Sequence, residues 1–223
     1  MERVRLYGIN PKITISKKVA IVGNSDNLLE KEYGREIDMF DDVIRFNFAD
    51  TNLHPKNTGT KTTIRWVSCP IRLAFAFEHK KDVRSQLAFH KYSREIFKDI
   101  VVIARKGSHK QIRAFDKNIR CFGPNEYYSI EETNKYLTKL GVKTKLKIIK
   151  NSKPRTGLIA ILTAIHSGCK PHIYGFDLVK KEYIRHYSLN RKYVVKDLKI
   201  HQINTEVAIL KELEKKKLII IKR

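Results

Sequence analysis

The sequence predicts an α/β protein: a single Rossmann-like layered domain with a mostly parallel central sheet flanked by helices. Short apolar, β-branched runs alternate along the chain with helical patterns, which is typical of such a layered sheet. The 223 residues are enough to bury a sizeable core. No repeat, low-complexity linker or Pro/Gly-rich boundary divides residues 1–223, so one domain is expected.

The predicted elements follow from local patterns. Residues 18–22 are an apolar run typical of a buried parallel strand, Gly23 ends it, and Ser25 is a good N-cap for a helix after it. Pro154 and Thr156 are start signals for an apolar helix over 156–167 that we expect to be buried. The other predicted elements are strands over 43–46, 62–67, 99–104, 118–122, 145–149, 172–175 and 218–221, and helices over 78–97, 129–141 and 200–217.

Charge is the feature in which the composition is unusual. The sequence has 46 Lys and Arg against 23 Asp and Glu, a net charge of +23. Such a field attracts nucleic acids, anionic membranes or acidic small molecules; a lysine-rich surface without a specific partner is the alternative. No apolar run reaches the roughly 18 residues of a membrane helix, and residues 1–5 lack a signal-peptide core. We therefore expect a cytoplasmic protein with reduced thiols at Cys69, Cys121 and Cys169.

The turn after the first predicted strand is a candidate ligand site, because open α/β sheets bind ligands beyond the carboxyl ends of their strands. Gly23 lets a ligand approach the backbone, Asn24 offers a donor and an acceptor, and a helix beginning near Ser25 presents N–H groups to an anion. One glycine does not make the GxGxxG fingerprint, so a dinucleotide site is rejected. An ordinary turn is the alternative.

Arg45 and Asn47 stand at the end of the next predicted strand, two residues apart. Because strand side chains alternate, we expect both to point to one side. Asn47 is predicted to contact a ligand. Arg45 is predicted to have a structural role, pairing with an acidic residue among Glu36, Asp38 and Asp42.

The start of the apolar helix is a candidate phosphate site. A helix N-terminus carries partial positive charge, and Gly157 beside Thr156 leaves room for a ligand. Lys153 and Arg155 add two cations. The alternative is an ordinary capped core helix.

His186 and His201 are the candidate catalytic histidines. His201 is expected at the start of the last long helix, followed five residues later by Glu206. A helix start disfavours the imidazolium, and a general base must be neutral. Two surface histidines are the alternative. No DxD pair follows a strand, so a reaction without a metal or other cofactor is expected.

In this order the motifs resemble those of the sialyltransferases of glycosyltransferase family 29. The long motif is matched by residues 19–25, 27–28, 43–47 and 59–63 with Gly34 and Asp38, and the small motif by Pro154, Thr156, Gly157, Ala164, His166 and residues 174–176. His186-Tyr187 matches the third motif, and His201 with Glu206 matches the last. The resemblance runs from about residue 18 to the end and implies an A-type variant glycosyltransferase fold.

The resemblance implies inverting, metal-independent transfer of sialic acid from its cytidine monophosphate (CMP) ester to a glycan or glycolipid. His201 would deprotonate the acceptor and His186 would hold the departing phosphate. The nucleotide would be bound by residues of the long and small motifs: Gly23, Asn24, Ser25, Asn47, Thr156, Gly157 and Gly175. Lys153 and Arg155 replace a tyrosine and a serine of the small motif, and these two cations would contact the phosphate.

Departures from the family pattern indicate a bacterial-type member. Val19 and Gly168 stand where animal enzymes have a disulfide, and the donor sugar could be another acid such as Kdo. We expect an enzyme that builds lipooligosaccharide or capsule, with possible peripheral contact with the anionic inner membrane and no nucleic-acid partner. The alternative is a non-catalytic RNA-binding protein that uses its basic surface.

Overall fold

Seven parallel strands form the centre of the chain in a computed structural model. The structure describes residues 2–9, 13–47, 49–67, 96–104, 112, 118–122, 129–150, 152–178 and 202–223, and the backbone of 183–186 and 189–194. The sheet order is β11-β8-β3-β4-β5-β6-β7, and each neighbouring pair is parallel. The predicted parallel α/β sheet is therefore confirmed. The strands are β3 (Val19–Val22), β4 (Asp42–Phe46), β5 (Ile64–Val67), β6 (Val101–Ala104), β7 (Arg120–Phe122), β8 (His172–Tyr174) and β11 (Ile220–Ile221).

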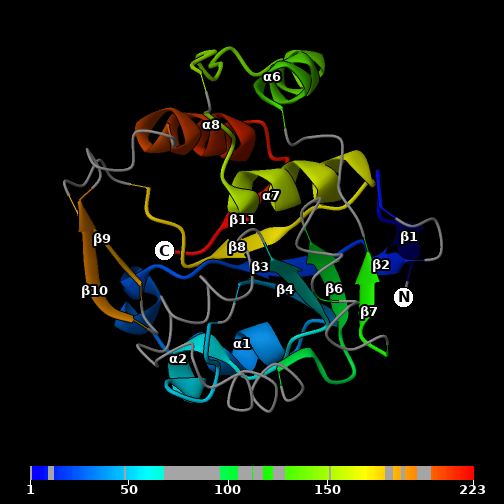
Figure 1. Cartoon of the computed structure of the whole chain (residues 1–223), viewed down its shortest axis with the longest axis vertical. Coiled ribbons are helices and arrows are strands. Elements are labelled where there is room, and N and C mark those ends of the chain that lie inside the picture. The colour runs from blue at the N-terminus through cyan, green and yellow to red at the C-terminus, as the bar shows by residue number, and fades with distance from the viewer. Residues whose placement is uncertain are drawn as a thin grey trace.

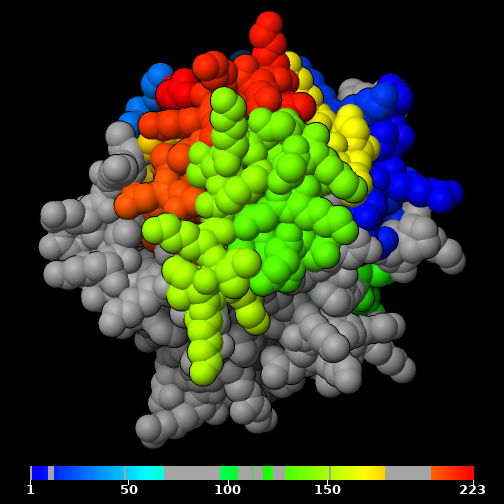
Figure 2. All heavy atoms as spheres, turned by 90° about the horizontal axis from the view of Figure 1, so that it is seen from above, coloured from blue at the N-terminus to red at the C-terminus, as the bar shows by residue number. Residues whose placement is uncertain are grey.

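Helices lie on both faces of this sheet (Figure 1). One face carries α7 (Thr156–His166) and α8 (Ile203–Lys215), with α6 (Ile130–Lys139) beyond them. The opposite face carries α1 (Gly34–Asp38) and α2 (Pro55–Thr58). Figure 2 views the molecule from the side of α6 and α8. Two antiparallel hairpins, β1 (Arg3–Arg5) with β2 (Thr14–Ser16) and β9 (Tyr183–His186) with β10 (Leu189–Val194), lie outside the sheet.

The alternation of side chains along the strands explains the two layers. In β3, Val19 and Ile21 pack in the cluster that contains α7 and α8, whereas Ala20 and Val22 pack with Ile37 of α1. Successive strand residues point to opposite faces, so a strand covered on both sides is apolar throughout. Helix α7 is also buried, at every residue from Leu158 to Ile165.

The strand order creates a switch point between β3 and β8. From β3 the chain adds β4, β5, β6 and β7 on one side, and then returns to add β8 and β11 on the other. In open parallel sheets, ligands bind at the carboxyl edge beside such a reversal. The turns after β3 and β8 therefore occupy the position at which this fold binds ligands.

Some predicted elements differ in the structure. The strand predicted over 145–149 is wrong: these residues form no strand, and the backbone groups of Leu146 and Lys147 bond to side chains of α6 and of the start of α8. The segment after Ser25 is a short 3-10 helix, η1 (Asp26–Glu30). Almost all of the helix predicted over 78–97 lies outside the described residues. Within the described ranges, no helix is both long and apolar enough to cross a membrane.

Candidate active site

Two glycines bring the carboxyl ends of β3 and β8 together. A Cβ atom on Gly23 would lie closer than 3.0 Å to the carbonyl oxygen of Gly175, and Gly175 has a positive φ of 65°. The amide of Gly23 donates to the carbonyl of Tyr174 at 2.7 Å, and that of Ser25 donates to the carbonyl of Gly175 at 3.2 Å. Both predicted site glycines thus have a packing reason to be glycine. Their contact fixes the geometry of the switch point.

Asn24 and Asn47 lie next to each other at this edge. The side-chain Nδ2 of Asn24 donates to the carbonyl of Phe46 at 3.4 Å, which joins the end of β3 to the end of β4. Asn47 follows Phe46 with φ 50°, a left-handed conformation that asparagine tolerates better than most residues. Strand β4 ends at Phe46, so Asn47 lies outside it. The alternation of strand side chains, from which Asn47 and Arg45 were expected to point to one side, therefore does not apply to Asn47.

Ser25 and Asn27 present polar atoms at the same edge. Neither Ser25 Oγ nor Asn27 Oδ1, both buried, has a hydrogen-bond partner among the described residues. Ser25 has the N-cap position of η1, but its side chain does not cap the helix. Buried polar atoms are nearly always bonded to protein, water or ligand. The hydroxyl of Ser25 and the amide oxygen of Asn27 are therefore available for a ligand.

Phe176 joins these residues to the start of α7. Its ring packs edge-on against Phe46 with centroids 6.2 Å apart, and its carbonyl accepts from Asn27 Nδ2 at 3.3 Å. A Cβ atom on Gly157 would lie 2.7 Å from this ring, so the glycine allows α7 to approach Phe176. Phe176 lies in the matched small motif, but no role in the site was predicted for it. Its position directly after Gly175, at the carboxyl end of β8, was the signal that could have identified it.

The start of α7 differs from the prediction in its N-cap residue and in the group that binds there. Arg155, not Thr156, is the N-cap, and its amide donates to Glu206 Oε1 at 2.8 Å. Arg155 Nε also donates to Glu206 Oε2 at 2.6 Å, and the Glu206 carboxylate is almost fully buried. Glu206 therefore joins α8 to α7 and offsets part of the positive charge at this helix start. The predicted phosphate contact of Arg155 now depends on the other guanidinium nitrogens.

The remaining predicted residues are placed less fully. Thr156 and Gly157 are partly exposed in the first turn of α7, and Lys153 is exposed just before it. His186 ends β9, where only the backbone is described, and His201 lies outside the described residues. Their catalytic roles stay predictions. The structure does bring together Gly23, Asn24, Ser25, Asn47, Gly157 and Gly175.

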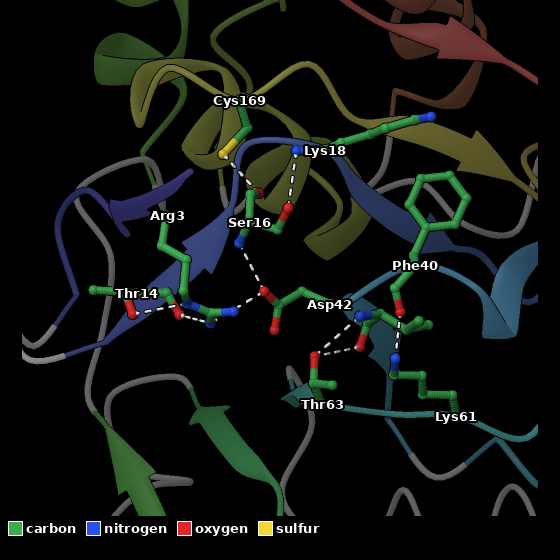
Figure 3. Close-up of polar contacts among 10 residues, drawn as sticks. Arg3, Thr14, Ser16, Lys18, Phe40, Asp42, Lys61, Thr63 and Cys169 are labelled. Atoms are coloured by element: carbon green, nitrogen blue, oxygen red, sulfur yellow. Dashed lines mark hydrogen bonds and ion pairs between the residues drawn. The ribbon is translucent and has the colours of Figure 1, made fainter. Parts of the chain in front are cut away.

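The opposite edge of the sheet carries a separate polar network (Figure 3). The carboxylate of Asp42, the first residue of β4, accepts from the amide of Ser16 at 2.7 Å and pairs with Arg3 at 3.2 Å. Cys169 Sγ lies 3.6 Å from the Ser16 carbonyl, and burial raises the pKa of this thiol to about 11. Cys121 and Cys169 are both buried free thiols.

Arg45 is structural, as predicted. Its side chain is buried, and Nε and Nη2 donate to the carbonyls of Lys61 and Thr58 at 2.9 and 2.7 Å. Arg45 therefore fixes the loop that follows α2. The acidic candidates make other contacts: Asp38 accepts from the amides of Thr60 and Lys61, and Asp42 pairs with Arg3.

The fold and the site together define an open α/β protein with a ligand-binding edge. Two backbone turns, a helix N-terminus, an aromatic ring and several amides converge there. This arrangement is suited to hold a polar ligand that carries an anionic group.

The chain belongs to glycosyltransferase family 29, the sialyltransferase family, whose model matches residues 10–218. The human CMP-N-acetylneuraminate-beta-1,4-galactoside alpha-2,3-sialyltransferase is 26% identical over an alignment 214 residues long, which covers 91% of this chain and 56% of that protein. The beta-1,6-galactosyltransferase GALT29A of Arabidopsis thaliana is also 26% identical, over 87% of this chain and 50% of its own length. The chain thus spans about half the length of these relatives.

A crystal structure of a mammalian sialyltransferase shares the fold, with a TM-score of 0.59 and 20% identity over 92% of this chain and 68% of that one. This supports the predicted layered fold. The relatives named above are animal and plant proteins, and the expectation of a bacterial-type member stays a prediction.

Proposed function

We propose that the chain is a glycosyltransferase that transfers sialic acid, or another acidic sugar such as Kdo, from its CMP ester to a hydroxyl of a glycan or glycolipid. The observation that carries this proposal is the meeting of two family motifs at the switch point. The long motif contributes Gly23, Asn24 and Asn47, and the small motif contributes Gly157 and Gly175. This edge is where parallel α/β sheets bind nucleotides.

The contacts at this edge support a nucleotide ligand. Ser25 Oγ can donate to a ligand oxygen and Asn27 Oδ1 can accept from a ligand hydroxyl or amine. Thr156 and Gly157 are partly exposed residues in the first turn of α7, and the backbone N–H groups of a helix start favour a phosphate. Lys153 adds a positive charge for the anionic donor.

The proposed reaction is a single displacement. His201 takes the proton from the acceptor hydroxyl as its oxygen bonds to the anomeric carbon. The bond from that carbon to the phosphate oxygen breaks on the opposite face, so its electron pair leaves with CMP and the configuration inverts. His186 and the start of α7 would stabilise the departing phosphate. Because these groups supply the positive charge, we propose that the reaction needs no metal.

The cellular setting is also a proposal. We infer a bacterial-type enzyme of the cytoplasm that builds lipooligosaccharide or capsule at the cytosolic face of the inner membrane. Two observations support it: the buried free thiols Cys121 and Cys169, which suit a reducing compartment, and the net charge of +23, which suits an anionic membrane.

A donor screen tests the proposal. The chain is incubated with CMP-sialic acid, CMP-Kdo and a nucleotide-activated galactose, each with and without a glycan acceptor, and released nucleotide is measured. Acceptor-dependent CMP release from an acidic sugar is expected, and a chelator should leave it unchanged. The plant relative, equally similar to this chain, makes galactose transfer the second candidate. Turnover of that donor alone would reject the CMP-sugar assignment.

The RNA-binding alternative is tested by thermal stability. CMP is expected to raise the melting temperature, and a short single-stranded RNA is not. Stabilisation by RNA alone, with no donor turned over, would replace the enzyme by a nucleic-acid-binding protein.

Substituting the proposed base tests its role. His201→Ala should lower turnover by about two to four decades because general-base catalysis is lost. CMP affinity should stay within about twofold, because His201 is assigned to the acceptor. His109→Ala, which removes a histidine outside the motifs, is the matched control. Wild-type turnover in His201→Ala would reject the base assignment.

A further inference from the structure

Residues 142–150 form an exposed segment that two helices hold in a fixed position. Asn134 of α6 makes two hydrogen bonds to Leu146: its Nδ2 donates to the carbonyl at 2.8 Å and its Oδ1 accepts from the amide at 2.9 Å. Gln202, at the start of α8, pairs in the same way with Lys147, at 2.6 Å for both bonds. These side chains make the backbone hydrogen bonds that a neighbouring strand would otherwise make, and they hold the segment in one conformation.

Glu212 of α8 fixes the beginning of the segment. Its carboxylate accepts from the amides of Lys143 and Thr144 at 2.7 and 3.0 Å. Leu146 is buried at 3% exposure and anchors the middle. The next side chains are therefore presented to solvent by a backbone that is already ordered.

Those side chains include two adjacent isoleucines. Ile148 is 73% exposed and Ile149 is 47% exposed. The other large apolar side chains exposed in the described part of the chain, Met39 and Leu53, lie far apart in the sequence. A single exposed apolar residue is ordinary, but an ordered adjacent pair forms a small apolar contact surface.

Lysines surround this pair. Residues 143–153 contain five lysines and no acidic residue, and Lys143, Lys147 and Lys150 are exposed. In Figure 2 the segment (lime green) lies beside α6 and α8 and projects from the face seen from above. The surface thus combines an aliphatic tip with a basic rim.

We propose that this tip-and-rim surface, residues 143–150, docks on an anionic lipid bilayer. The isoleucines enter the boundary between headgroups and acyl chains, and the lysines contact anionic headgroups. Nucleic acid fits less well, because base recognition uses aromatic or arginine side chains and leaves two aliphatic tips without a partner.

This inference assigns a surface to the membrane contact of the proposed function, and it rests on that proposed function. Gln202, which holds Lys147, directly follows His201, the proposed base. Docking at residues 143–150 would therefore bring a glycolipid acceptor close to the start of α8. A soluble acceptor would not need the docking step.

Vesicle co-sedimentation of the full chain tests the surface. The probes are vesicles of phosphatidylcholine alone and vesicles of phosphatidylcholine with phosphatidylglycerol, each at low and high salt. Binding is expected only to the anionic vesicles and should weaken with salt. The double variant Ile148→Ser/Ile149→Ser should lose about tenfold or more in partition coefficient. Lys147→Glu and Lys150→Glu should each lose about fivefold or more.

Matched controls lie elsewhere on the surface. Met39→Ser removes an apolar side chain that is 77% exposed, and Lys56→Glu reverses an exposed lysine of α2; neither should change the partition coefficient. Equal melting temperatures of all variants exclude misfolding. Equal binding by wild type and the isoleucine variant overturns the inference. Salt-sensitive binding to single-stranded RNA with no vesicle binding also overturns it and assigns the face to nucleic acid.

Transfer to a water-soluble oligosaccharide is measured in parallel. It should be unchanged in the isoleucine variant. Transfer without vesicle binding rejects the docking surface alone, whereas vesicle binding without transfer to any acceptor rejects the proposed function alone.

Discussion

The two edges of the parallel sheet use polar residues in different ways. At the amino edge, the Asp42 carboxylate is bonded to Ser16 and Arg3, and the Thr63 hydroxyl accepts from the amide of Val43 at 3.0 Å (Figure 3). At the carboxyl edge, Ser25 Oγ and Asn27 Oδ1 are buried without a partner among the described residues. The amino edge also has one buried nitrogen, Nδ1 of His172, without a partner among the described residues, but the carboxylate and hydroxyl of the Asp42 and Thr63 contacts are bonded.

This difference separates stability from binding. A satisfied network holds loops in place and gains little from a ligand, whereas a buried unpaired atom costs stability until a partner arrives. The carboxyl edge also contributes to stability, because backbone packing requires glycine at Gly23 and Gly175. Motif residues at one edge therefore have two separate functions, and substitutions can distinguish them.

The largest effect is expected at Gly23. In Gly23→Ala the added Cβ would collide with the Gly175 carbonyl, which is backbone that cannot rotate away, and should lower the free energy of unfolding by about 3 kcal/mol. Gly168→Ala is the control: its φ of 82° is strained for alanine, but nothing lies within 4 Å of the Cβ, so about 1 kcal/mol is expected. Urea unfolding measures both. Equal losses would mean that the contact between β3 and β8 does not determine the packing there.

Asp42→Ala should act on stability alone. It leaves the buried Ser16 amide without an acceptor and Arg3 without its ion pair, which should cost about 2 kcal/mol in urea unfolding. CMP affinity should not change, because Asp42 is at the opposite end of β4 from the site. The neighbouring Asp41→Ala should stay within about 0.5 kcal/mol. A loss of CMP affinity in Asp42→Ala would show that the amino edge also contributes to ligand binding.

Asn24→Ala should show the reverse pattern. Its hydrogen bond to the Phe46 carbonyl is long, at 3.4 Å, so stability should fall by less than about 1 kcal/mol. CMP affinity, measured by calorimetry, should fall about tenfold when a ligand contact is removed. Unchanged affinity would give Asn24 a purely structural role.

The last expected effect is a pH dependence at the amino edge. Burial, with Lys18 and Lys222 nearby, lowers the pKa of His172 to about 4. Between its ordinary pKa of 6.5 and 4 the unfolded chain binds a proton that the folded chain does not, so this histidine lowers stability as the pH falls through that range. His172→Phe keeps an aromatic ring against Phe40 and should lose less melting temperature from pH 7 to pH 5 than the wild type. An identical loss would show that other groups control acid sensitivity.

Much of the fold could be predicted from local patterns. Residues 18–22 and 156–167 were apolar enough to identify a buried strand and a buried helix, because burial on both faces leaves a continuous apolar run. The same reasoning failed at residues 145–149. That segment is strand-like in composition, but its backbone partners are the side chains of Asn134 and Gln202, which no local pattern reveals.

The sequence by itself determined most of the element types, the motif residues and their order, since these depend mainly on neighbours in the chain. Only the tertiary structure decided that Gly23 meets Gly175, that Phe176 closes against Gly157, and that Glu206 belongs to Arg155. These pairs join segments between 19 and 152 residues apart, so their contact depends on strand order and helix packing. Hydrophobic periodicity specifies which face of an element is buried, but not which distant residue lies against it.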